Sequence, residues 1–185
     1  MNALINLHNA TFARLEARAD AILPSLARFA FGAVLLVYFL NSARTKIGDG
    51  LLGLFKPAAG AYFQIFPRAI EAAGYDPSAL SSWHYLVVLA GTWAEILLPI
   101  FIVIGLFTRL SALAMIGFIA VQSLTDLYGH GLIDEPKAVG AWFDIDSASL
   151  LMDQRLLWIV LLLILVFKGA GPLSLDRLLA ARRSR

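Results

Sequence analysis

Four apolar segments, each long enough to cross the hydrocarbon core of a membrane, set the main limit on how this chain can fold. They cover residues of about 24–45, 83–107, 109–127 and 149–170 in a sequence of 185 residues. A membrane-spanning helix needs about 20 mostly apolar residues. Inside lipid the backbone must satisfy its own hydrogen bonds, as a helix does. We therefore expect an all-α fold, an integral membrane four-helix bundle over residues 24–170.

The composition leads to the same class of protein. Hydrophobic residues make up 59% of the chain and charged residues 15%, whereas soluble domains have about 25% charged residues. A globule of 20.1 kDa lacks the interior to hide so much apolar surface from water. The net charge of +2 gives no basis for a nucleic-acid partner. The absence of cysteine excludes iron–sulfur clusters and disulfides.

The segments outside the spans predict helices at membrane surfaces. In residues 1–23, apolar side chains recur at helical spacing, which indicates an amphipathic surface helix; a loose solvent-exposed tail is the alternative. The first loop, residues 46–82, is apolar and is interrupted by Pro57 and Pro67, so we expect short amphipathic helices over the outer mouth of the bundle. Residues 171–185 form a basic tail with a short helix suited to anionic head groups.

Lysine and arginine counts give the expected orientation. Four spans put both termini on one side of the membrane, and the basic excess near the termini makes that side cytoplasmic. The first outer loop carries contrary evidence, namely Arg44, Lys46, Lys56 and Arg68. We expect Trp83 and Trp158 to lie in the interfacial belts.

Glu95 lies near the middle of the second span and is the leading candidate for a catalytic role, handling protons or a polar ligand. An acidic side chain at that depth is costly and is by default a functional-site hypothesis. Pro99 cannot donate to the carbonyl of Glu95, so one helical turn presents both a carboxyl group and a free carbonyl. Gly91, one turn earlier, allows close approach of a ligand or helix. The alternative is a purely structural hydrogen bond.

Polar residues at the outer ends of the spans predict a ligand-binding mouth. Gln122, Asp126 and His130 lie on one face of the third span because they are four residues apart. Together with aromatic walls such as Trp83 and Trp142, such a mixture suits a quinone head group or a small polar substrate. The alternative is that these residues simply meet water and head groups. The other expected contributors are Asn41, Arg44, Lys46, His84, Asp153 and Arg155.

Two cofactor patterns are weaker. His84 and His130 could contribute to a metal site, but they have no ligand spacing that predicts one. The stretch Gly48-Asp49-Gly50-Leu51-Leu52-Gly53 matches the letters G-x-G-x-x-G, yet no strand precedes it and no βαβ unit follows. We interpret it as a loop and expect no bound nucleotide.

Three short motifs in order resemble the DoxX family of small four-helix bacterial membrane proteins, over roughly residues 28–178. Arg28 opens the first span and Lys46 follows its end, although Ala43 stands where the family has a glycine before the lysine. Glu95 is followed by the turn Gly105-Leu106-Phe107-Thr108-Arg109-Leu110. The last span ends in Gly169-Ala170-Gly171-Pro172-Leu173-Ser174-Leu175-Asp176.

This resemblance implies a place in the bacterial inner membrane and a membrane subunit of a quinone-linked redox or oxidative-stress complex. A quinone would then be the substrate, and a soluble or membrane redox protein the partner, because nothing in this chain can carry electrons alone. Two alternatives stay open. One is a non-enzymatic scaffold for a soluble partner, including enzymes of metal-stress peptide biosynthesis; the other is a small transporter. A homo-oligomer is compatible with each.

Overall fold

The regular secondary structure is helical in residues 2–183, the part of the chain that this computed structural model describes, and loops and turns connect the helices. Its β-structure there is limited to one isolated bridge between Ile47 and Pro57. The α-helices are α1 (Asn2–Phe31), α2 (Val37–Arg44), α3 (Ala59–Ile65), α4 (Pro67–Ala72), α5 (Ser82–Ile104), α6 (Thr108–Leu124), α7 (Pro136–Val139), α8 (Arg155–Lys168) and α9 (Leu175–Arg183). Short π-helical or 3₁₀ turns cover Gly32–Leu36, Pro77–Ala79, Thr125–Gly129, Leu132–Asp134 and Leu150–Gln154.

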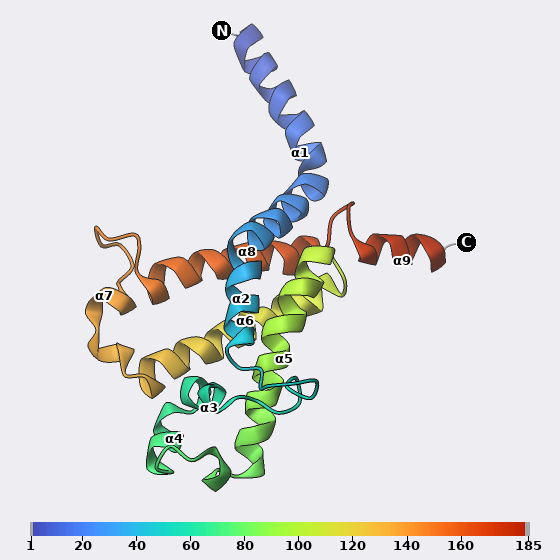
Figure 1. Ribbon diagram of the computed structural model, residues 1–185. Coiled ribbons are helices and arrows are strands. Elements are labelled where there is room, and N and C mark those ends of the chain that lie inside the picture. Colours follow the sequence, from blue (N-terminus) through green and yellow to red (C-terminus); the bar gives the residue numbers. More distant parts are fainter. Residues whose placement is uncertain (1, 184–185) are drawn as a thin grey trace.

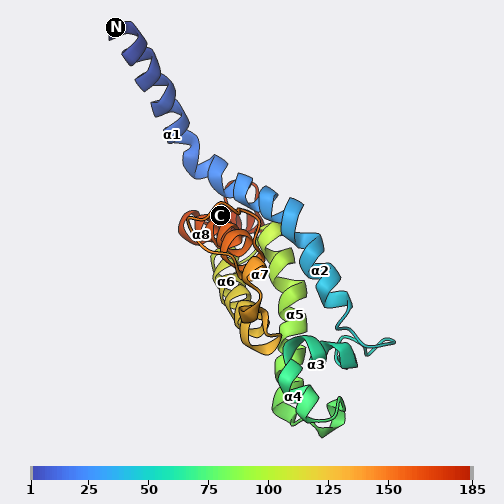
Figure 2. The same ribbon diagram turned by 90° about the vertical axis from the view of Figure 1, so that its left-hand side faces the viewer.

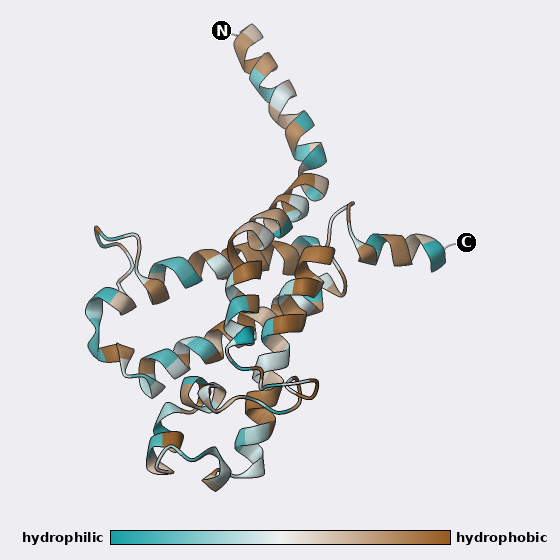
Figure 3. Cartoon of the chain, in the orientation of Figure 1, coloured by the Kyte–Doolittle hydropathy of each residue, from teal (hydrophilic) through white to brown (hydrophobic). Residues whose placement is uncertain are grey.

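Within residues 2–183, four helical stretches are long and apolar enough to cross a membrane. They are Asn2–Arg44, Ser82–Ile104, Thr108–Gly129 and Leu150–Lys168. The last three agree with the predicted spans to within about one helical turn. This is the make-up of a multi-pass membrane protein, and Figure 3 shows hydrophobic residues along all four stretches.

The first stretch differs from the prediction at Pro24. We expected a surface helix to end there and a span to begin, but α1 runs through Pro24 and continues by a π-helical turn into α2. Proline removes one backbone donor, but the sequence on both sides keeps its helical periodicity. The buried Pro24 ring also packs near Gly171 of the C-terminal loop. Figures 1 and 2 show the first half of α1 extending away from the other helices.

The long helices form a fan. Helix α8 packs on α1 and α6, and α5 packs on α2 and α6. Figure 1 shows the end of α5, the start of α6 and the end of α8 close together, while the opposite ends of these helices spread apart. The short helices α3 and α4 lie beside the first turns of α5, where they share a small second core.

The main core is built from one face of each long helix. On the first helical stretch the buried positions are four residues apart, which places them on one side. Trp158 belongs to this core and is 9% exposed, in contact with the rings of Tyr38 and Phe39. Its side chain therefore points towards α2 and into the core rather than outwards. The other buried core residues are Ala27, Phe31, Leu35, Ile102, Ala112, Met115, Ile119, Leu162 and Leu165.

The C-terminal segment is fastened to the turn between α5 and α6. The Asp176 carboxylate accepts hydrogen bonds from the backbone N–H groups of Phe107 (2.7 Å) and Thr108 (2.9 Å). It thereby satisfies two of the four donors that a helix N-terminus leaves unpaired. The Asp176 N–H in turn donates to the carbonyl of Gly105 at 2.9 Å. The motif after the second span and the motif after the fourth are therefore one structural unit.

Gly105 is the most constrained residue of this unit, and we expect Gly105→Ala to destabilise the protein by about 2–4 kcal/mol. Its φ is +71°, a left-handed conformation that favours glycine. An added Cβ would also lie 2.6 Å from the Cβ of Ser174 and 2.9 Å from the Cζ of Arg28. Thermal unfolding of the detergent-solubilised variant measures the loss.

Gly74→Ala is the matched control. Gly74 also has a positive φ, +66°, but an added Cβ there would meet no atom within 4 Å. Gly74→Ala is therefore expected to destabilise the protein by the backbone strain alone, about 1–2 kcal/mol. Equal destabilisation by the two substitutions would contradict the tight packing described at Gly105.

Candidate functional site

A cavity of about 660 Å³ lies at the spread end of the fan. It is bounded by α2, α3, α5, α6, the start of α8 and the π-helical turns that end α6 and precede α8. Pockets that bind small organic ligands have volumes of about 300–1,000 Å³ and are mostly apolar with a few polar groups. The apolar wall is formed by Ile65, Val87, Ala90, Ala94, Ala114, Gly117, Phe118, Val121 and Leu150.

One side of the cavity carries a buried ion pair between Lys46 and Glu95. The Lys46 Nζ lies 3.1 Å from Glu95 Oε1 and 3.0 Å from Oε2, and each residue is 4% exposed. Ser42 joins both groups: its hydroxyl donates to Glu95 Oε1 at 3.3 Å and accepts from Lys46 Nζ at 2.8 Å. The predicted acid of the second span therefore has a cationic partner, which stabilises its charged form in a low-dielectric site.

The backbone after α2 explains why Lys46 points inward. The Lys46 N–H donates to the carbonyl of Ala43 at 2.9 Å, which turns the chain at the end of the helix. The Lys46 carbonyl accepts from Ala58 at 2.9 Å, which anchors the loop that follows. Ser42, on the last turn of α2, and Lys46, in the turn that follows, both reach Glu95. Lys46 lies beyond the last residue of α2 and still reaches into the span.

A second ion pair, between Arg155 and Asp126, lines the other side of the cavity. Arg155 begins α8, is 2% exposed, and donates to the Asp126 carboxylate and to the Ser123 hydroxyl, the latter at 2.8 Å. Two buried polar atoms here, Arg155 Nε and Gln122 Oε1, have no hydrogen-bond partner among the described residues. Such atoms are rare in folded proteins, and a bound water or ligand is one source of the missing partner.

The mouth of the cavity holds two weaker polar contacts. The amide of Gln122 donates to the Tyr38 hydroxyl at 3.3 Å. His130 Nε2 lies 2.9 Å from the carbonyl oxygen of Gln64 in α3. Gly91 faces α3 as well, because an added Cβ there would lie 3.5 Å from Ile65. Titratable, hydroxyl and amide groups therefore surround one apolar space.

The structure brings together five of the predicted site residues. Glu95, Gly91, Gln122, Asp126 and His130 all line the cavity, as do Lys46 and Arg155 from the predicted outer mouth. All of them come from the spans or from positions immediately after one. Spacing along the spans was therefore a good guide to which polar groups converge.

Three predicted ligand-binding residues lie elsewhere. Arg44 is exposed and does not line the cavity. The His84 ring packs against Phe66, and its Nδ1 lies 2.9 Å from the Ser81 hydroxyl. The Asp153 carboxylate accepts from the backbone N–H of Ser149 at 2.9 Å and so closes the start of the fourth span. His84 and Asp153 are held by partners in their own loop or turn, which is why they do not reach the common space.

The aromatic wall also differs from the expected one. Trp83 and Trp142 do not line the cavity, and the Trp142 indole donates to the carbonyl of Met152 at 3.2 Å. The aromatic residues that line it are Tyr38 and Phe118.

Sequence reasoning missed Tyr38, Ser42 and Gln64. A signal existed for the first two, because Tyr38, Ser42 and Lys46 are four residues apart and form a polar stripe on the first span. Gln64 lies in α3, within a loop whose approach to the cavity has no periodic signal in the sequence.

The residues considered for a metal do not form a site. His84 and His130 belong to different contacts, and no group of three or more His, Cys, Asp or Glu side chains within residues 2–183 is arranged to hold an ion. The stretch from Gly48 to Gly53 is a tight loop in which the Gly48 N–H donates to the Gly53 carbonyl at 3.1 Å.

In comparisons with known proteins, no family model, no curated protein and no solved structure matches the chain.

Proposed function

We propose that this protein is the membrane subunit of a quinone-linked redox complex and that the head group of a quinone binds in the cavity between α2, α5, α6 and α8. The observation that carries the proposal is that two ion pairs, Lys46–Glu95 and Arg155–Asp126, line one apolar-walled space. A quinone needs this combination, because its ring is apolar while its two carbonyl oxygens accept hydrogen bonds.

The chemistry assigns roles to the lining residues. Reduction of a quinone to a quinol takes up two electrons and two protons. Lys46 and Arg155 supply donors for the carbonyl oxygens, and the unpaired Nε of Arg155 is a donor still without a partner among the described residues. Glu95, next to Lys46, and His130, at the mouth, are groups that can transfer the protons.

The electrons come from a partner protein in this proposal. The sequence contains no cysteine to hold an iron–sulfur cluster and no pattern that predicts a nucleotide or flavin site. The resemblance to the DoxX family supports the same assignment, since some members are membrane subunits of thiosulfate:quinone oxidoreductase. The resemblance also implies a bacterial inner-membrane location. The basic excess near the termini supports placing both termini in the cytoplasm, which puts the cavity mouth on the outer side.

We expect the double variant Glu95→Gln/His130→Ala to bind a short-chain ubiquinone analogue at least about tenfold more weakly than the parent protein. Loss of hydrogen bonds involving charged groups has an effect of this size. The analogue is titrated into the detergent-solubilised protein, and quenching of tryptophan fluorescence reports binding. Trp158 suits this measurement because its ring centroid is 5.5 Å from that of Tyr38, which lines the cavity.

Two further variants separate binding from folding. His84→Ala/Glu71→Gln makes the same chemical changes outside the cavity and is expected to leave affinity unchanged. Gly117→Leu places a side chain in open space beside the cavity wall, because an added Cβ at Gly117 meets no atom within 4 Å. This variant is expected to fold and to block the quinone. Unchanged binding by both Gly117→Leu and Glu95→Gln/His130→Ala would reject the site.

A further inference from the structure

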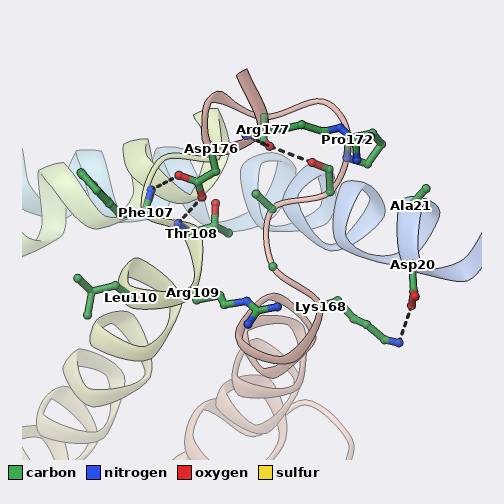
Figure 4. A pocket seen from close by; sticks show the side chains of 14 residues that line it. Asp20, Ala21, Phe107, Thr108, Arg109, Leu110, Lys168, Pro172, Asp176 and Arg177 are labelled. Carbon is green, nitrogen blue, oxygen red and sulfur yellow. Dashed lines mark hydrogen bonds and ion pairs between the residues drawn. The ribbon is translucent and has the colours of Figure 1, made fainter. Parts of the chain in front are cut away.

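A second cavity, of about 670 Å³, lies at the opposite end of the fan from the proposed quinone site. It is bounded by the start of α6, the end of α8, the loop of residues 169–174 and the first turn of α9, with α1 on its far side. Figure 4 shows three basic side chains among its lining residues: Arg109 from α6, Lys168 from α8 and Arg177 from α9. These residues come from three different elements and surround one space.

The basic side chains of this cavity have few strong hydrogen-bond or ion-pair partners among the described residues. The Arg177 side chain makes no hydrogen bond or ion pair to any described residue, and Arg109 makes one long bond, 3.3 Å, to the carbonyl of Phe167. Lys168 pairs with Asp20 at 2.6 Å, but the two side chains are 45% and 81% exposed. Exposed ion pairs contribute little to stability, so an anion that binds Lys168 can replace Asp20 at small cost.

The acidic residues nearby do not cancel this positive charge. Asp176 also lines the cavity, but both of its carboxylate oxygens already accept backbone hydrogen bonds at the start of α6, as Figure 4 shows. Asp20 lies at the outer edge, on the exposed half of α1. An anion in the cavity would therefore meet two arginines and a lysine whose partner can be displaced.

The position of the cavity relative to the membrane indicates which kind of anion it fits. Thr108 begins one candidate span and Lys168 ends another, so the cavity lies at the level where hydrocarbon gives way to water. Its rim is apolar on the side of Phe107 and Leu110, which are 61% and 67% exposed. A molecule that matches both features has a phosphate and a hydrocarbon chain attached to it.

We propose that this cavity binds the head-group phosphate of an anionic phospholipid, held by Arg109, Lys168 and Arg177, with the acyl chains against Phe107 and Leu110. Helix α9 supports this placement because exposed Leu175, Leu178 and Leu179 alternate with basic residues along it. Basic pockets between membrane helices are known to bind anionic lipid head groups. The site is independent of the proposed quinone cavity.

The test is a titration of the full-length protein in detergent with phosphatidylglycerol, in which native mass spectrometry counts bound lipid. The triple variant Arg109→Gln/Lys168→Gln/Arg177→Gln is expected to bind about 10- to 100-fold more weakly. The matched control Lys56→Gln/Arg68→Gln/Lys137→Gln removes three charges that do not line the cavity, from the loop before α3, from α4 and from α7, and is expected to bind like the parent protein. Arg177→Glu alone, at a side chain with no partner to lose among residues 2–183, is expected to weaken binding without affecting the fold.

Three outcomes would overturn the proposal. Equal loss of affinity in the triple variant and its control would mean that net charge alone attracts the lipid. Equal binding of phosphatidylcholine and phosphatidylglycerol would remove the role of the anionic head group. Displacement of bound phosphatidylglycerol by millimolar inorganic phosphate, with thermal stabilisation by phosphate alone, would show that the site takes a free anion rather than a lipid.

Discussion

Replacing Lys46 by methionine is expected to destabilise the protein by about 3–5 kcal/mol, because the substitution leaves Glu95 buried without its cationic partner. For a chain of this size that loss lowers the midpoint of thermal unfolding by roughly 6–20 °C. Methionine keeps the apolar stem of lysine, so the packing changes little. Thermal unfolding in detergent, followed by tryptophan fluorescence, measures the effect.

A double-mutant cycle separates the interaction between Lys46 and Glu95 from the effect of each substitution by itself. Lys46→Met/Glu95→Leu removes both charges and is expected to recover most of the stability lost in Lys46→Met, since two apolar groups in place of a buried ion pair are often neutral. Lys56→Met is the matched control, because Lys56 is exposed and its side chain makes no ion pair among the described residues; a change within about 0.5 kcal/mol is expected there. Additive losses in the double variant would contradict a direct interaction between Lys46 and Glu95.

The cycle also bears on function. Whether the pair is purely structural or also binds the ligand, the effects of Lys46→Met and Glu95→Leu on stability are expected to be non-additive. Only a ligand-binding pair also gives non-additive effects on quinone affinity. If Lys46→Met/Glu95→Leu regains stability and still fails to bind the quinone analogue, the charges serve the ligand rather than the fold. If it regains both, the pair holds α2 against α5 and the proposed function fails.

The spans could be predicted because long apolar segments are a local property of the sequence. The same holds for the spacing of Gln122, Asp126 and His130, which reach the cavity as predicted. Glu95 was recognisable because an acid within an apolar span has few explanations. Each of these inferences needs only one helix and its periodicity.

The partners of these residues could not be predicted, because they depend on how separate helices rotate and cross. Lys46 was visible as a basic residue beyond the first span, but nothing local shows that its ammonium group folds back onto Glu95. The burial of Trp158 could not be predicted for the same reason: its side chain suits either an interface or a core, and its direction depends on how α8 packs on α1 and α6.

The second large effect is expected from Arg28→Met, which we predict to destabilise the protein by about 4 kcal/mol. Arg28 donates to four backbone carbonyls: those of Ile102 (3.1 Å), Val103 (2.5 Å), Ala170 (2.9 Å) and Leu173 (2.5 Å). The first two belong to the last turn of α5, whose carbonyls lack partners within the helix. Hydrogen bonds from a charged donor contribute about 1.5–3 kcal/mol each but are not additive.

Limited trypsin digestion gives a second measurement of Arg28→Met. Two of the four carbonyls belong to the loop that leads into α9, so losing their donor is expected to release the C-terminal segment and to speed cleavage after Arg177 several-fold. Arg14→Met, on the exposed part of α1, is the control for the same chemical change. Parent-like cleavage together with a parent-like unfolding midpoint in Arg28→Met would contradict the prediction.

The variant Asp176→Asn tests whether Arg28 and Asp176 stabilise the same contact, that of the C-terminal segment with the turn between α5 and α6. Asp176 holds the C-terminal segment to the start of α6, while Arg28 holds the loop before it to the end of α5. Once either contact is lost, the segment is partly released and the other contact has less to stabilise. The stability lost in the double variant Arg28→Met/Asp176→Asn is therefore expected to be about 0.5–3 kcal/mol smaller than the sum of the losses in the two single variants. Strict additivity would mean that the α5–α6 turn and the C-terminal loop are stabilised independently.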